Sequence, residues 1–589
     1  MCTLGLFNIH RACWCWQLQA MRALTVALSC AASHAFRAPL PRKLPTTTRT
    51  AIDDLYTSKG VTTTTTRAAV APPPGKSWRT KEGPQSTLIA GGGPAGLLTA
   101  IAFAKRGWTN IRVVDRLREP YDPGDELIWS DAARFYLVGL GLRGQTALTE
   151  LGAWDTVQSY CAEVVGRKDW APGAGPDEGV ERIFTDRPVS TQVIARDRMQ
   201  GALYKVAKEK YGSQINFDWE TEVDVEDDDV TLTKGATEEV LRPSLIVGAD
   251  GTARTVAMAL EENDRRVRIK RYDDDNCRVF KTVPLDLPEG WRGDVNYSTR
   301  SKGGRMNFDA LPSDAENRRY CGVLLLREGD ALAQEDSSPD ELRALMKECL
   351  PQFEPFVNDE NLNNIAKKPA SRLPGFRYVG PRIHKADRVV LLGDAIHTVK
   401  PYFGLGANSA FEDVTSLDKC LDEHDNGADA LKAFSRARAP EAKALVQISR
   451  GFDRPGFRGF VSFILPIILD SIFHAKFPKV FGPNTIASLQ RRDTFVRVRW
   501  NKRRDRLLQV AVLGSGLYLA ASSVRLLARL ALSTPAARRT SLIGAAAVAV
   551  AGLAAKALSF FERGMAPADV LTKTNSSPVA NSNEDFVTN

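Results

Sequence analysis

Short apolar runs that end at glycine or aspartate recur through the middle of this 589-residue chain. The first run covers residues 87–90 and is followed by a glycine-rich turn, by apolar side chains at helical spacing over 97–105, and by a second apolar run at 110–115. Short apolar runs bounded by turn residues are typical of buried strands, and the runs at 245–248 and 388–392 are predicted strands on the same grounds. The pattern predicts an α/β fold built on a Rossmann-like sheet.

The N-terminal end has the composition of a targeting segment. Residues 1–80 contain only two acidic side chains, Asp53 and Asp54, and are rich in Arg, Ser, Thr, Ala and Pro, so we assign them to a presequence and linker. Ala32-Ser33-His34-Ala35-Phe36 follows an apolar stretch and resembles the bipartite plastid presequence of algae with secondary plastids. We favour such a plastid over the mitochondrial outer membrane. Mitochondrial or secretory targeting and a misassigned upstream extension are the alternatives.

The C-terminal end alternates basic and apolar segments. Residues 491–506 hold eight basic and two acidic side chains, and the next eighteen residues, 507–524, carry no charge. A second uncharged run of sixteen residues covers 540–555. Both runs lie at or just below the roughly 17–25 residues that span a bilayer, so we predict membrane helices within 506–562. A spanning hairpin, two interfacial helices and an ordinary buried helix pair remain open.

Two other C-terminal segments carry weaker signals. The apolar run 459–469 is interrupted by Pro466 and is predicted to be too short to span a membrane. Residues 563–589 are rich in Ser, Asn, Pro and Thr and are predicted to be disordered.

Composition excludes several classes of protein. Hydrophobic residues make up 43% and charged residues 25%, which is ordinary for a globular chain. The nine Cys form no CxxC pair and the six His have no metal-ligand spacing, so we expect neither a disulfide framework nor a metal centre. The net charge of +9 is concentrated in 491–506, which favours a membrane surface over a nucleic acid as partner.

The glycine-rich turn after the first strand has the spacing GxGxxG. It reads Gly91-Gly92-Gly93-Pro94-Ala95-Gly96. Gly91 permits the tight turn, Gly93 lets the backbone approach a pyrophosphate, and Gly96 lets helix and strand pack closely. Asp115 ends the second strand, where a carboxylate can accept hydrogen bonds from an adenosine ribose. The turn predicts dinucleotide binding, but alone it cannot separate FAD from NAD.

Two further elements indicate the cofactor. The strand at 245–248 leads into Gly-Ala-Asp250-Gly, and the strand at 388–392 leads into Gly393-Asp394 and then 401–408, Pro-Tyr-Phe-Gly-Leu-Gly-Ala-Asn. With the first turn, these elements resemble the flavoprotein aromatic hydroxylases over roughly residues 86–450. The resemblance implies FAD as cofactor, NADPH or NADH as transient reductant, O2 as co-substrate, and an interleaved mixed-sheet domain that binds the substrate.

The resemblance also implies a domain order. FAD-binding segments are expected at 86–165, 190–262 and 381–425, substrate-domain segments at 166–189 and 263–380, and a helical C-terminal region at 426–505.

The same resemblance implies the site residues. The expected cofactor-binding residues are Gly91, Gly93, Pro94, Ala95, Gly96, Asp115, Arg143, Arg196, Asp250, Gly393, Asp394, Pro401, Gly404, Leu405, Gly406, Ala407 and Asn408. Arg167, Tyr402 and Phe403 are expected to bind substrate. Neither a catalytic side chain nor a metal is expected, because the flavin carries the chemistry. A helix beginning near Gly404 should direct its N–H groups at the flavin ring and stabilise negative charge there.

Within the family, the likeness is nearest to the kynurenine 3-monooxygenases. It rests on 393–397, 401–408, Phe411-Glu412-Asp413, Phe434-Ser435-Arg436 and Leu142-Arg143-Gly144. This implies hydroxylation of an aromatic or other small substrate through a flavin C4a-hydroperoxide. The alternatives are a plastid membrane flavoprotein reductase or epoxidase acting on a lipophilic isoprenoid or pigment, and a non-catalytic FAD-binding membrane protein.

Two features of the sequence depart from the family pattern. After the Asp-Gly pair, Arg254 stands where the family usually has Ser, and Ala257 stands where it usually has Arg. The family's substrate-contacting Tyr should fall near 190–192, and no Tyr is there. The first departure leaves open whether Arg254 has a compensating role, and the second argues against assuming kynurenine as substrate.

Overall fold

The computed structural model describes residues 65–67, 77–129, 136–185, 187–226, 229–301, 304–314, 318–335 and 337–533. All of these residues belong to one unit of the chain, Thr63–Asn589. Most of the predicted presequence, the predicted apolar helix at 540–555 and the predicted disordered tail lie outside the described residues.

A six-stranded sheet organises the first α/β region. Its order is β21-β22-β13-β2-β3-β9, and only the β21–β22 pair is antiparallel. In that order the strands are His384–Lys385, Val389–Leu391, Leu245–Gly248, Thr87–Ala90, Ile111–Asp115 and Ile215–Trp219. The strands predicted from the apolar runs are therefore present, and the sheet brings the ends of β2, β13 and β22 side by side.

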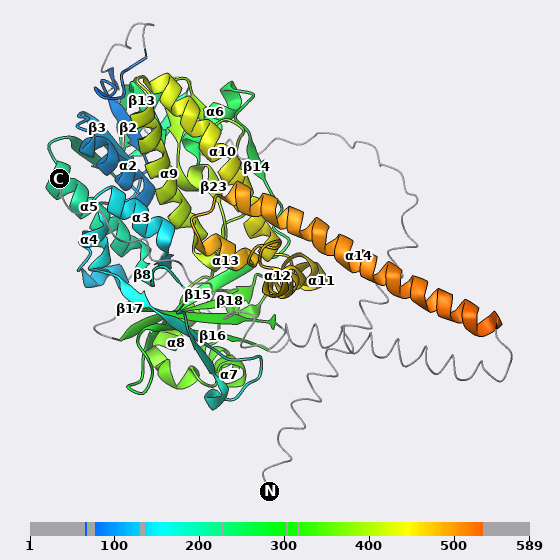
Figure 1. The fold of residues 1–589 in the computed structure, drawn as a ribbon. Helices are drawn as coiled ribbons and strands as arrows, with labels where there is room; N and C mark the ends of the chain where they lie inside the picture. Colours follow the sequence, from blue (N-terminus) through cyan, green and yellow to red (C-terminus); the bar gives the residue numbers. More distant parts are fainter. Residues whose placement is uncertain are drawn as a thin grey trace, which may run out of the picture. The chain divides into compact units, whose positions relative to one another are not determined.

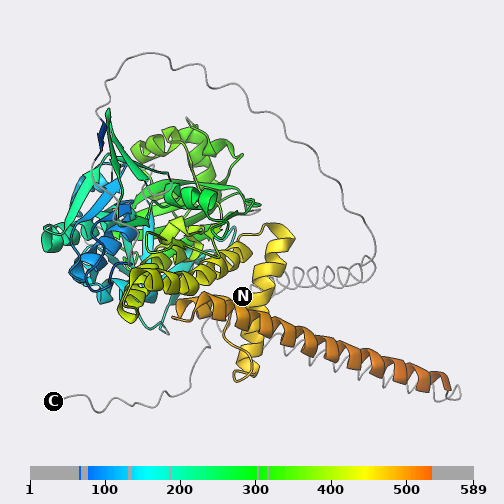
Figure 2. The ribbon, with the colours of Figure 1, turned by 90° about the horizontal axis from the view of Figure 1, so that it is seen from above.

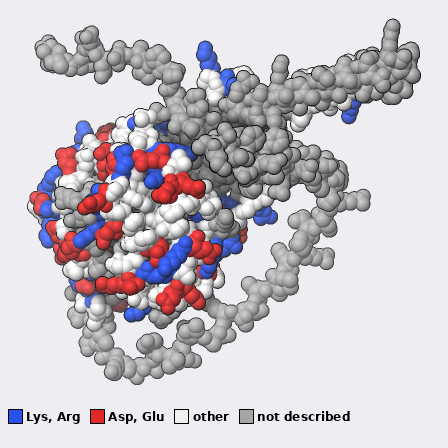
Figure 3. Space-filling model, turned by 90° about the horizontal axis from the view of Figure 1, so that it is seen from below, with Lys and Arg blue, Asp and Glu red and all other residues white. Residues whose placement is uncertain are grey.

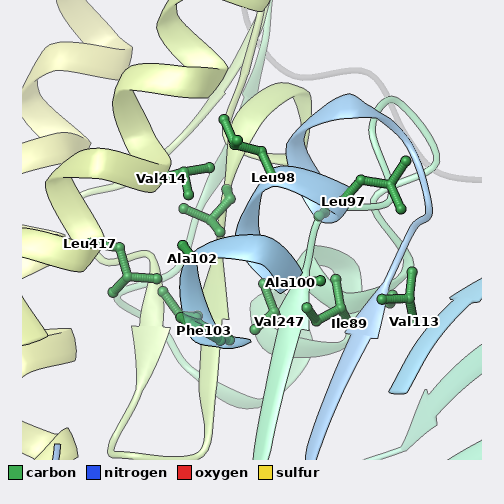
Figure 4. Close-up of a cluster of buried hydrophobic side chains, with 14 of the residues drawn as sticks. Ile89, Leu97, Leu98, Ala100, Ala102, Phe103, Val113, Val247, Val414 and Leu417 are labelled. Carbon is green, nitrogen blue, oxygen red and sulfur yellow. The ribbon is translucent and has the colours of Figure 1, made fainter. Parts of the chain in front are cut away.

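Both faces of this sheet are covered. β2 and β13 are buried along their whole length, as expected for parallel strands between layers of helix. Helix α2 (Pro94–Lys105) contacts α5 (Arg196–Tyr211) and α9 (Leu405–Glu423). In Figure 4, apolar side chains of α2 lie between the sheet and α9. They include Leu98, Ala102 and Phe103, which lie near Ile89, Val247, Val414 and Leu417.

A seven-stranded sheet forms the second region, in the order β19-β15-β18-β17-β16-β6-β7. Its strands are Ser371–Arg372, Arg278–Asp286, Arg319–Arg327, Asn307–Asp314, Val295–Arg300, Gly166–Asp169 and Val180–Ile183. β6 and β7 come from a distant part of the chain, and β6 joins β16 in parallel register with Arg167 opposite Asn296. The segment 166–183 and the segment 278–372 therefore share one sheet.

The two faces of the second sheet differ in chemistry. One face packs against α7 (Pro339–Cys349) and α8 (Asp359–Lys367) through a buried cluster that includes Tyr297, Phe308 and Leu324. Figure 1 shows these two helices on the side of the sheet away from α9. Because side chains alternate along a strand, Asn296 and Ser298 point to the opposite face.

A small antiparallel sheet connects the two regions. β8 (Thr191–Ala195) lies between β4 (Leu137–Leu140) and β5 (Ala162–Val164). β17 of the second sheet contacts both β5 and β8. The face of the second sheet opposite α7 and α8 is thus turned toward the first region. Two other small sheets have the orders β14-β20-β23 and β1-β12-β11-β10. The strands of the first are Ile269–Arg271, Arg377–Val379 and His397–Thr398, and those of the second are Thr65–Arg67, Thr237–Leu241, Asp229–Lys234 and Glu222–Glu226.

Helices dominate the C-terminal region. The long ones are α9, α10 (Gly427–Phe452) and α14 (Phe495–Ser533). Shorter ones between them are α11 (Gly456–Gly459), η8 (Phe460–Ile464), α12 (Leu465–Lys476) and α13 (Thr485–Gln490).

The prediction that 459–469 is too short to span a membrane was wrong. α11, the π-helical turn η8 and α12 are continuous and form an apolar segment of 21 residues, Gly456–Lys476. Pro466 lies inside this continuous helix, directly after the π-helical turn η8, a local irregularity of the kind that accommodates a proline within a helix. The prediction ended the run before Asp470, whose carboxylate is buried rather than exposed. Length and composition alone would let this segment and Phe495–Leu526 cross a membrane, which is weak evidence for spanning.

Part of the basic block in α14 is used inside the protein. The Asp470 carboxylate accepts hydrogen bonds from Arg506 (2.8 Å) and Gln509 (3.1 Å), and Lys502 lies 3.3 Å from it. Beyond this crossing of α12 and α14, apolar side chains of α14 are exposed, with Val510 at 70%. Figure 2 shows α14 continuing past the other described elements.

Charge on the α/β regions is mixed. Figure 3 shows acidic and basic side chains interspersed over the face that it draws, without a continuous basic field.

Candidate cofactor and substrate site

The turn between β2 and α2 has no room for side chains at its first and last glycines. Gly91 has φ +108°, and a Cβ there would lie 2.4 Å from the Ala249 carbonyl oxygen. A Cβ on Gly96 would lie 1.8 Å from the Gly91 carbonyl oxygen. Both glycines are therefore required by close backbone approach within the fold, the first against the end of β13.

Gly93 differs from its neighbours because it faces open space. It is the N-cap of α2, and a Cβ placed on it would meet nothing within 4 Å. Pro94 opens the helix, no side chain caps it, and no acidic residue lies in its first turn. Free N–H groups at a helix N-terminus bind phosphate well, since they combine donors with the positive end of the helix dipole.

Asp115 holds the turn between β2 and α2 through hydrogen bonds to backbone N–H groups. Its Oδ2 accepts a hydrogen bond from the Gly92 N–H (2.8 Å) and its Oδ1 accepts one from the Leu117 N–H (2.8 Å). Gln200 donates to the Gly92 carbonyl oxygen (2.7 Å) and holds the turn from α5. Each Asp115 oxygen keeps a further lone pair, so the oriented carboxylate can still accept from a ribose hydroxyl.

The second glycine turn packs directly on the first. Gly393 follows β22 with φ +61°, and a Cβ on it would lie 3.2 Å from the Cβ of Ala95. Asp394 remains partly accessible to solvent, yet burial raises the pKa of its carboxyl above the usual value.

The N-terminus of α9 faces the same place. Gly404 is its N-cap in the left-handed region, and a Cβ there would lie 3.1 Å from the Gly139 carbonyl oxygen. A Cβ on Gly406 would lie 4.0 Å from Asp394 Oδ1. No side chain caps the helix and its first turn holds no acid, so the N–H groups of Leu405 and Ala407 are available to an electron-rich ligand.

The side-chain amide of Asn408 is engaged entirely within the protein. Its Oδ1 accepts from the N–H groups of Gly141 and Gly144 (both 3.0 Å). Its Nδ2 donates to the carbonyl oxygens of Gly139 (2.8 Å) and Gly404 (2.6 Å). These bonds use the full capacity of an Asn amide, so its side chain has no group left for a flavin. It fixes α9 against the turn between β4 and α3 (Leu142–Glu150).

Asp413 is a site residue that the sequence prediction missed. It is fully buried, and its Oδ2 accepts the Gly393 N–H (2.9 Å) and bonds His397 Nε2 (2.8 Å). Its Oδ1 accepts from Arg438 Nε (2.7 Å). Burial alone would raise the pKa of Asp413, but Arg438 and His397 outweigh burial and hold that pKa below its usual value. The only sequence signal was the motif Phe411-Glu412-Asp413 itself.

The two arginines expected to contact the cofactor lie in different environments. Arg143 donates to Glu412 (2.6 Å) and to the carbonyl oxygens of Arg491 (3.0 Å) and Asp493, and its guanidinium lies over the Phe495 ring. Its donors therefore join α3 to the C-terminal region, not to the glycine turns.

Arg196 remains a candidate for cofactor contact. It begins α5, donates to Asp197 and interacts electrostatically with both Asp115 and Asp394. A guanidinium placed between the two acids that flank the glycine turns can balance a pyrophosphate.

Asp250 and Arg254 complete the cofactor side. Burial raises the pKa of Asp250, whose Oδ1 is buried without a hydrogen-bond partner. Such an oriented, unpartnered carboxylate oxygen fits a ligand hydroxyl. Arg254 points inward and donates to the carbonyl oxygen of Asp394 (2.6 Å).

The expected substrate residues are not brought to one place. Arg167, in β6, bonds Asp169 Oδ1 (Nε at 2.8 Å) on the second sheet. Tyr402 donates to Asp453 Oδ1 (2.6 Å), and Phe403 packs edge-on against Phe452 with 4.9 Å between ring centroids. These two aromatic residues therefore contact the end of α10, before the apolar segment Gly456–Lys476.

Arg187 is a second basic residue that the sequence prediction missed. Its guanidinium lies over the Phe184 ring at 3.6 Å and donates to Thr191 Oγ1 (3.1 Å). Burial, with a smaller contribution from the like charge of Arg167, lowers the pKa of Arg187 to about 10. Among the described residues it has no acidic hydrogen-bond partner. Thr191 Cγ2 lies 3.2 Å from where a Gly139 Cβ would be, and the Gly139 carbonyl oxygen lies 3.1 Å from where a Gly404 Cβ would be, so Arg187 is three contacts from the N-terminus of α9.

The arrangement fits FAD. Two uncapped helix N-termini, with open space at Gly93, supply donors for a pyrophosphate. The oriented Asp115 and the unpartnered Asp250 oxygen supply acceptors for hydroxyl groups of FAD. Among the described residues no group of His, Cys, Asp and Glu could hold a metal ion.

Comparison with known proteins agrees with this geometry. Residues 85–449 match the family described as FAD binding domain. The chain is similar to a kynurenine 3-monooxygenase of Salinispora tropica, with 27% identity over 444 residues, 74% of this chain and 94% of that protein. It is 28% identical over 371 residues to the Salinispora arenicola protein of the same name, covering 62% of this chain and 78% of that one.

A solved structure of 2-methyl-3-hydroxypyridine-5-carboxylic acid oxygenase shares the fold. It matches with a TM-score of 0.50 and 22% identity, and covers 64% of this chain and 96% of that one.

Gly93 and Gly96 provide a matched pair of substitutions. Gly93→Ala adds a methyl group in open space at φ −73°, so we expect the unfolding free energy of the apo-protein to change by less than about 0.5 kcal/mol. FAD should bind at least about tenfold more weakly, because that space is where the pyrophosphate approaches. Gly96→Ala should lower the unfolding free energy by roughly 3 kcal/mol or more. Urea unfolding and FAD titration measure both, and unchanged FAD affinity in Gly93→Ala would contradict the assignment.

Proposed function

The chain belongs to the FAD-binding family of flavoprotein aromatic monooxygenases, and from this premise we propose that it hydroxylates a small aromatic acid with NAD(P)H as electron donor and O2 as oxygen donor. The observation that carries the proposal is the meeting of three turns from distant segments. The Gly93 turn, the Asp250 turn and the Asp394 turn contact one another, and the uncapped N-terminus of α9 adjoins the last of them.

The proposed reaction converts an aromatic C–H bond into C–OH. One atom of O2 enters the product and the other leaves as water, while NAD(P)H and one proton are consumed and NAD(P)+ is formed. Bound FAD would supply the electron transfer and the oxygen activation. The residues of the chain bind and orient the reactants, exclude water and stabilise charge. No nucleophilic or acid–base side chain is needed, in agreement with the structural role of His397, whose Nε2 bonds Asp413.

Different residues would bind different parts of the cofactor. The N-termini of α2 and α9 would hold the pyrophosphate and the flavin ring, Asp115 and Asp394 would accept from sugar and ribityl hydroxyl groups, and Arg196 would balance phosphate charge. Asp413 and Asn408 keep these groups in place through buried hydrogen bonds.

Arg167 and Arg187 lead us to propose that the substrate carries a carboxylate. The like charge of Arg167 acts on the Arg187 guanidinium, which donates to Thr191 in β8, a strand that contacts the second sheet. An anion placed between the two guanidinium groups would relieve this repulsion and could bind each guanidinium with two hydrogen bonds. Asn296, the register partner of Arg167, has a buried Oδ1 without a partner that can accept from an amine. An aromatic amino acid such as kynurenine carries both groups.

Kynurenine oxidation tests the function and its substrate together. The purified full chain with FAD should oxidise NADPH faster when L-kynurenine is added, and mass spectrometry should find a product that has gained one oxygen atom. Arg167→Met and Arg187→Met should each raise KM about tenfold with little change in kcat, because each removes a charged hydrogen-bond donor from bound substrate.

The matched control for these substitutions is Arg292→Met. Arg292 lies beside the same sheet and is 43% exposed, paired with Asp294 and Glu181. The KM of the Arg292→Met variant should equal the KM of the wild type. A flavin-loaded protein that ignores kynurenine but oxidises NADPH in the presence of an isoprenoid or pigment would instead support the lipophilic reductase or epoxidase. Flavin binding without any turnover would support a non-catalytic protein.

Membrane association is a further part of the proposal. The exposed apolar side chains of α14 and of Gly456–Lys476 adjoin a block of basic residues, an arrangement that favours an anionic bilayer surface. The composition of 1–80 favours the plastid of a secondary-plastid alga over the mitochondrial outer membrane. Imaging of a full-length fluorescent fusion would decide between these compartments.

Vesicle flotation tests the membrane contact. The full chain should float with vesicles that contain anionic lipid. The double substitution Val510→Glu and Leu517→Glu should lower the bound fraction about tenfold or more, because charge is costly in the bilayer. Val180→Glu changes an apolar residue of β7 that is 54% exposed and should have no effect. Equal flotation of the double variant and the wild type would contradict this role for α14.

A further inference from the structure

Arg254 is the largest buried charged side chain of the cofactor region. It is 2% exposed and occupies the left-handed backbone region with φ +59°, at the N-cap of α6 (Thr255–Asn263). Its Nη2 donates to the carbonyl oxygen of Asp394 (2.6 Å) and to Thr398 Oγ1, and its Nη1 donates to the carbonyl oxygen of Thr252 (3.3 Å). One side chain therefore connects the turn after β13 to the turn after β22.

Among the described residues, no acid forms a hydrogen bond with Arg254 that would neutralise its charge. Its acceptors are two carbonyl oxygens and a hydroxyl, and its Nε is buried without a partner. The carboxylates of Asp394 and Asp250 act on it only through space, while Arg377 and Arg271 repel it. Burying a cation without a directly paired acid costs free energy. The buried guanidinium of Arg254 therefore requires a compensating interaction.

We propose that Arg254 positions the Asp394 turn for FAD and supplies a buried positive charge that favours the reduced, more negative state of the bound flavin. Arg254 acts through Asp394 and is a positioning residue. This inference rests on the proposed binding of FAD. It also accounts for the departure in the sequence, because the arginine absent at position 257 is replaced by one that starts at position 254 and reaches inward.

The contacts indicate how the positioning works. The Asp394 carbonyl oxygen accepts from both Arg254 Nη2 (2.6 Å) and Thr398 Oγ1 (3.2 Å), so the peptide that follows Asp394 is held from two sides. One residue earlier, the peptide group between Leu392 and Gly393 is held through its N–H by Asp413 (2.9 Å). The turn is therefore fixed at two points, and Asp394 Oδ1 lies 4.0 Å from where a Cβ of Gly406 would be, at the N-terminus of α9.

Substitution of Arg254 should alter bound flavin beyond any loss of stability. In Arg254→Met, we expect FAD to bind the apo-protein at least about tenfold more weakly, since charged hydrogen bonds are lost. The midpoint potential of the remaining bound flavin should shift to a lower value, because a nearby positive charge has been removed. Arg254→Lys should restore most of the potential and only part of the affinity, since it keeps the charge but not the fork of donors.

Arg318 provides the matched control. It also has a positive φ of +51°, donates through Nη2 to two carbonyl oxygens (Pro288 at 2.9 Å and Trp291 at 2.6 Å) and has a buried Nε without a partner, but it lies in the second sheet region. Arg318→Met should lower stability without changing flavin affinity or potential. Thr398→Val removes only the shared hydroxyl and tests the same connection if Arg254→Met does not fold; it should weaken FAD binding with little change in potential.

The outcomes separate this inference from the proposed function. Failure of the wild-type chain to bind FAD would overturn both. The role of Arg254 alone would be overturned if the wild type binds FAD but the variants behave like it. In that case the folded Arg254 variants would show unchanged FAD affinity and flavin potential, and Thr398→Val would show unchanged FAD affinity. We expect Arg254→Met to lose FAD affinity and to lower the flavin midpoint potential. We expect Arg318→Met to show neither effect.

Discussion

The site depends most on the buried carboxylate of Asp413. Three groups from different segments meet on it: the Gly393 N–H, His397 Nε2 and Arg438 Nε. Because an unpaired charge in a protein interior costs several kcal/mol, all three partners must be present together. This requirement fixes α9 relative to the end of β22 and to α10. Since Gly404 and Gly406 begin α9, the same contact decides where the helix N-terminus points.

A second set of contacts connects the site to the C-terminal region. Lys400, whose side chain is fully buried, donates to Asp453 (2.7 Å) and Asp274 (2.8 Å), and Tyr402 donates to the same Asp453. Asp453 follows α10 directly and precedes the apolar segment Gly456–Lys476. The loop that leads into α9 is thus joined to the segment proposed to contact a membrane. Arg143 makes a comparable connection between α3 and the start of α14.

The sequence predicted what depends on local chemistry. The strands around the glycine turn, the tight packing at Gly91 and Gly96 and the open helix end at Gly93 follow from residue types in a short stretch of chain. Side-chain partners from distant segments could not be predicted in this way. Nothing near Asn408 in the sequence indicates that residues 139–144 will make three of its four amide hydrogen bonds. Nothing near Arg143 indicates that its partners will lie in 491–495. The prediction for 459–469 failed for the same reason, since the partners that bury Asp470 lie in α14.

The central claim is that buried contacts around Asp413 build a site for one FAD per chain. Calorimetric titration of the full-length apo-protein with FAD tests it most directly when wild type and Asp413→Asn are compared. The wild type should bind one FAD per chain, and a folded Asp413→Asn should bind it far more weakly, because the amide cannot replace the charge that holds Arg438 and His397. A folded wild type that binds no FAD, or an Asp413→Asn variant with wild-type affinity, would contradict the account.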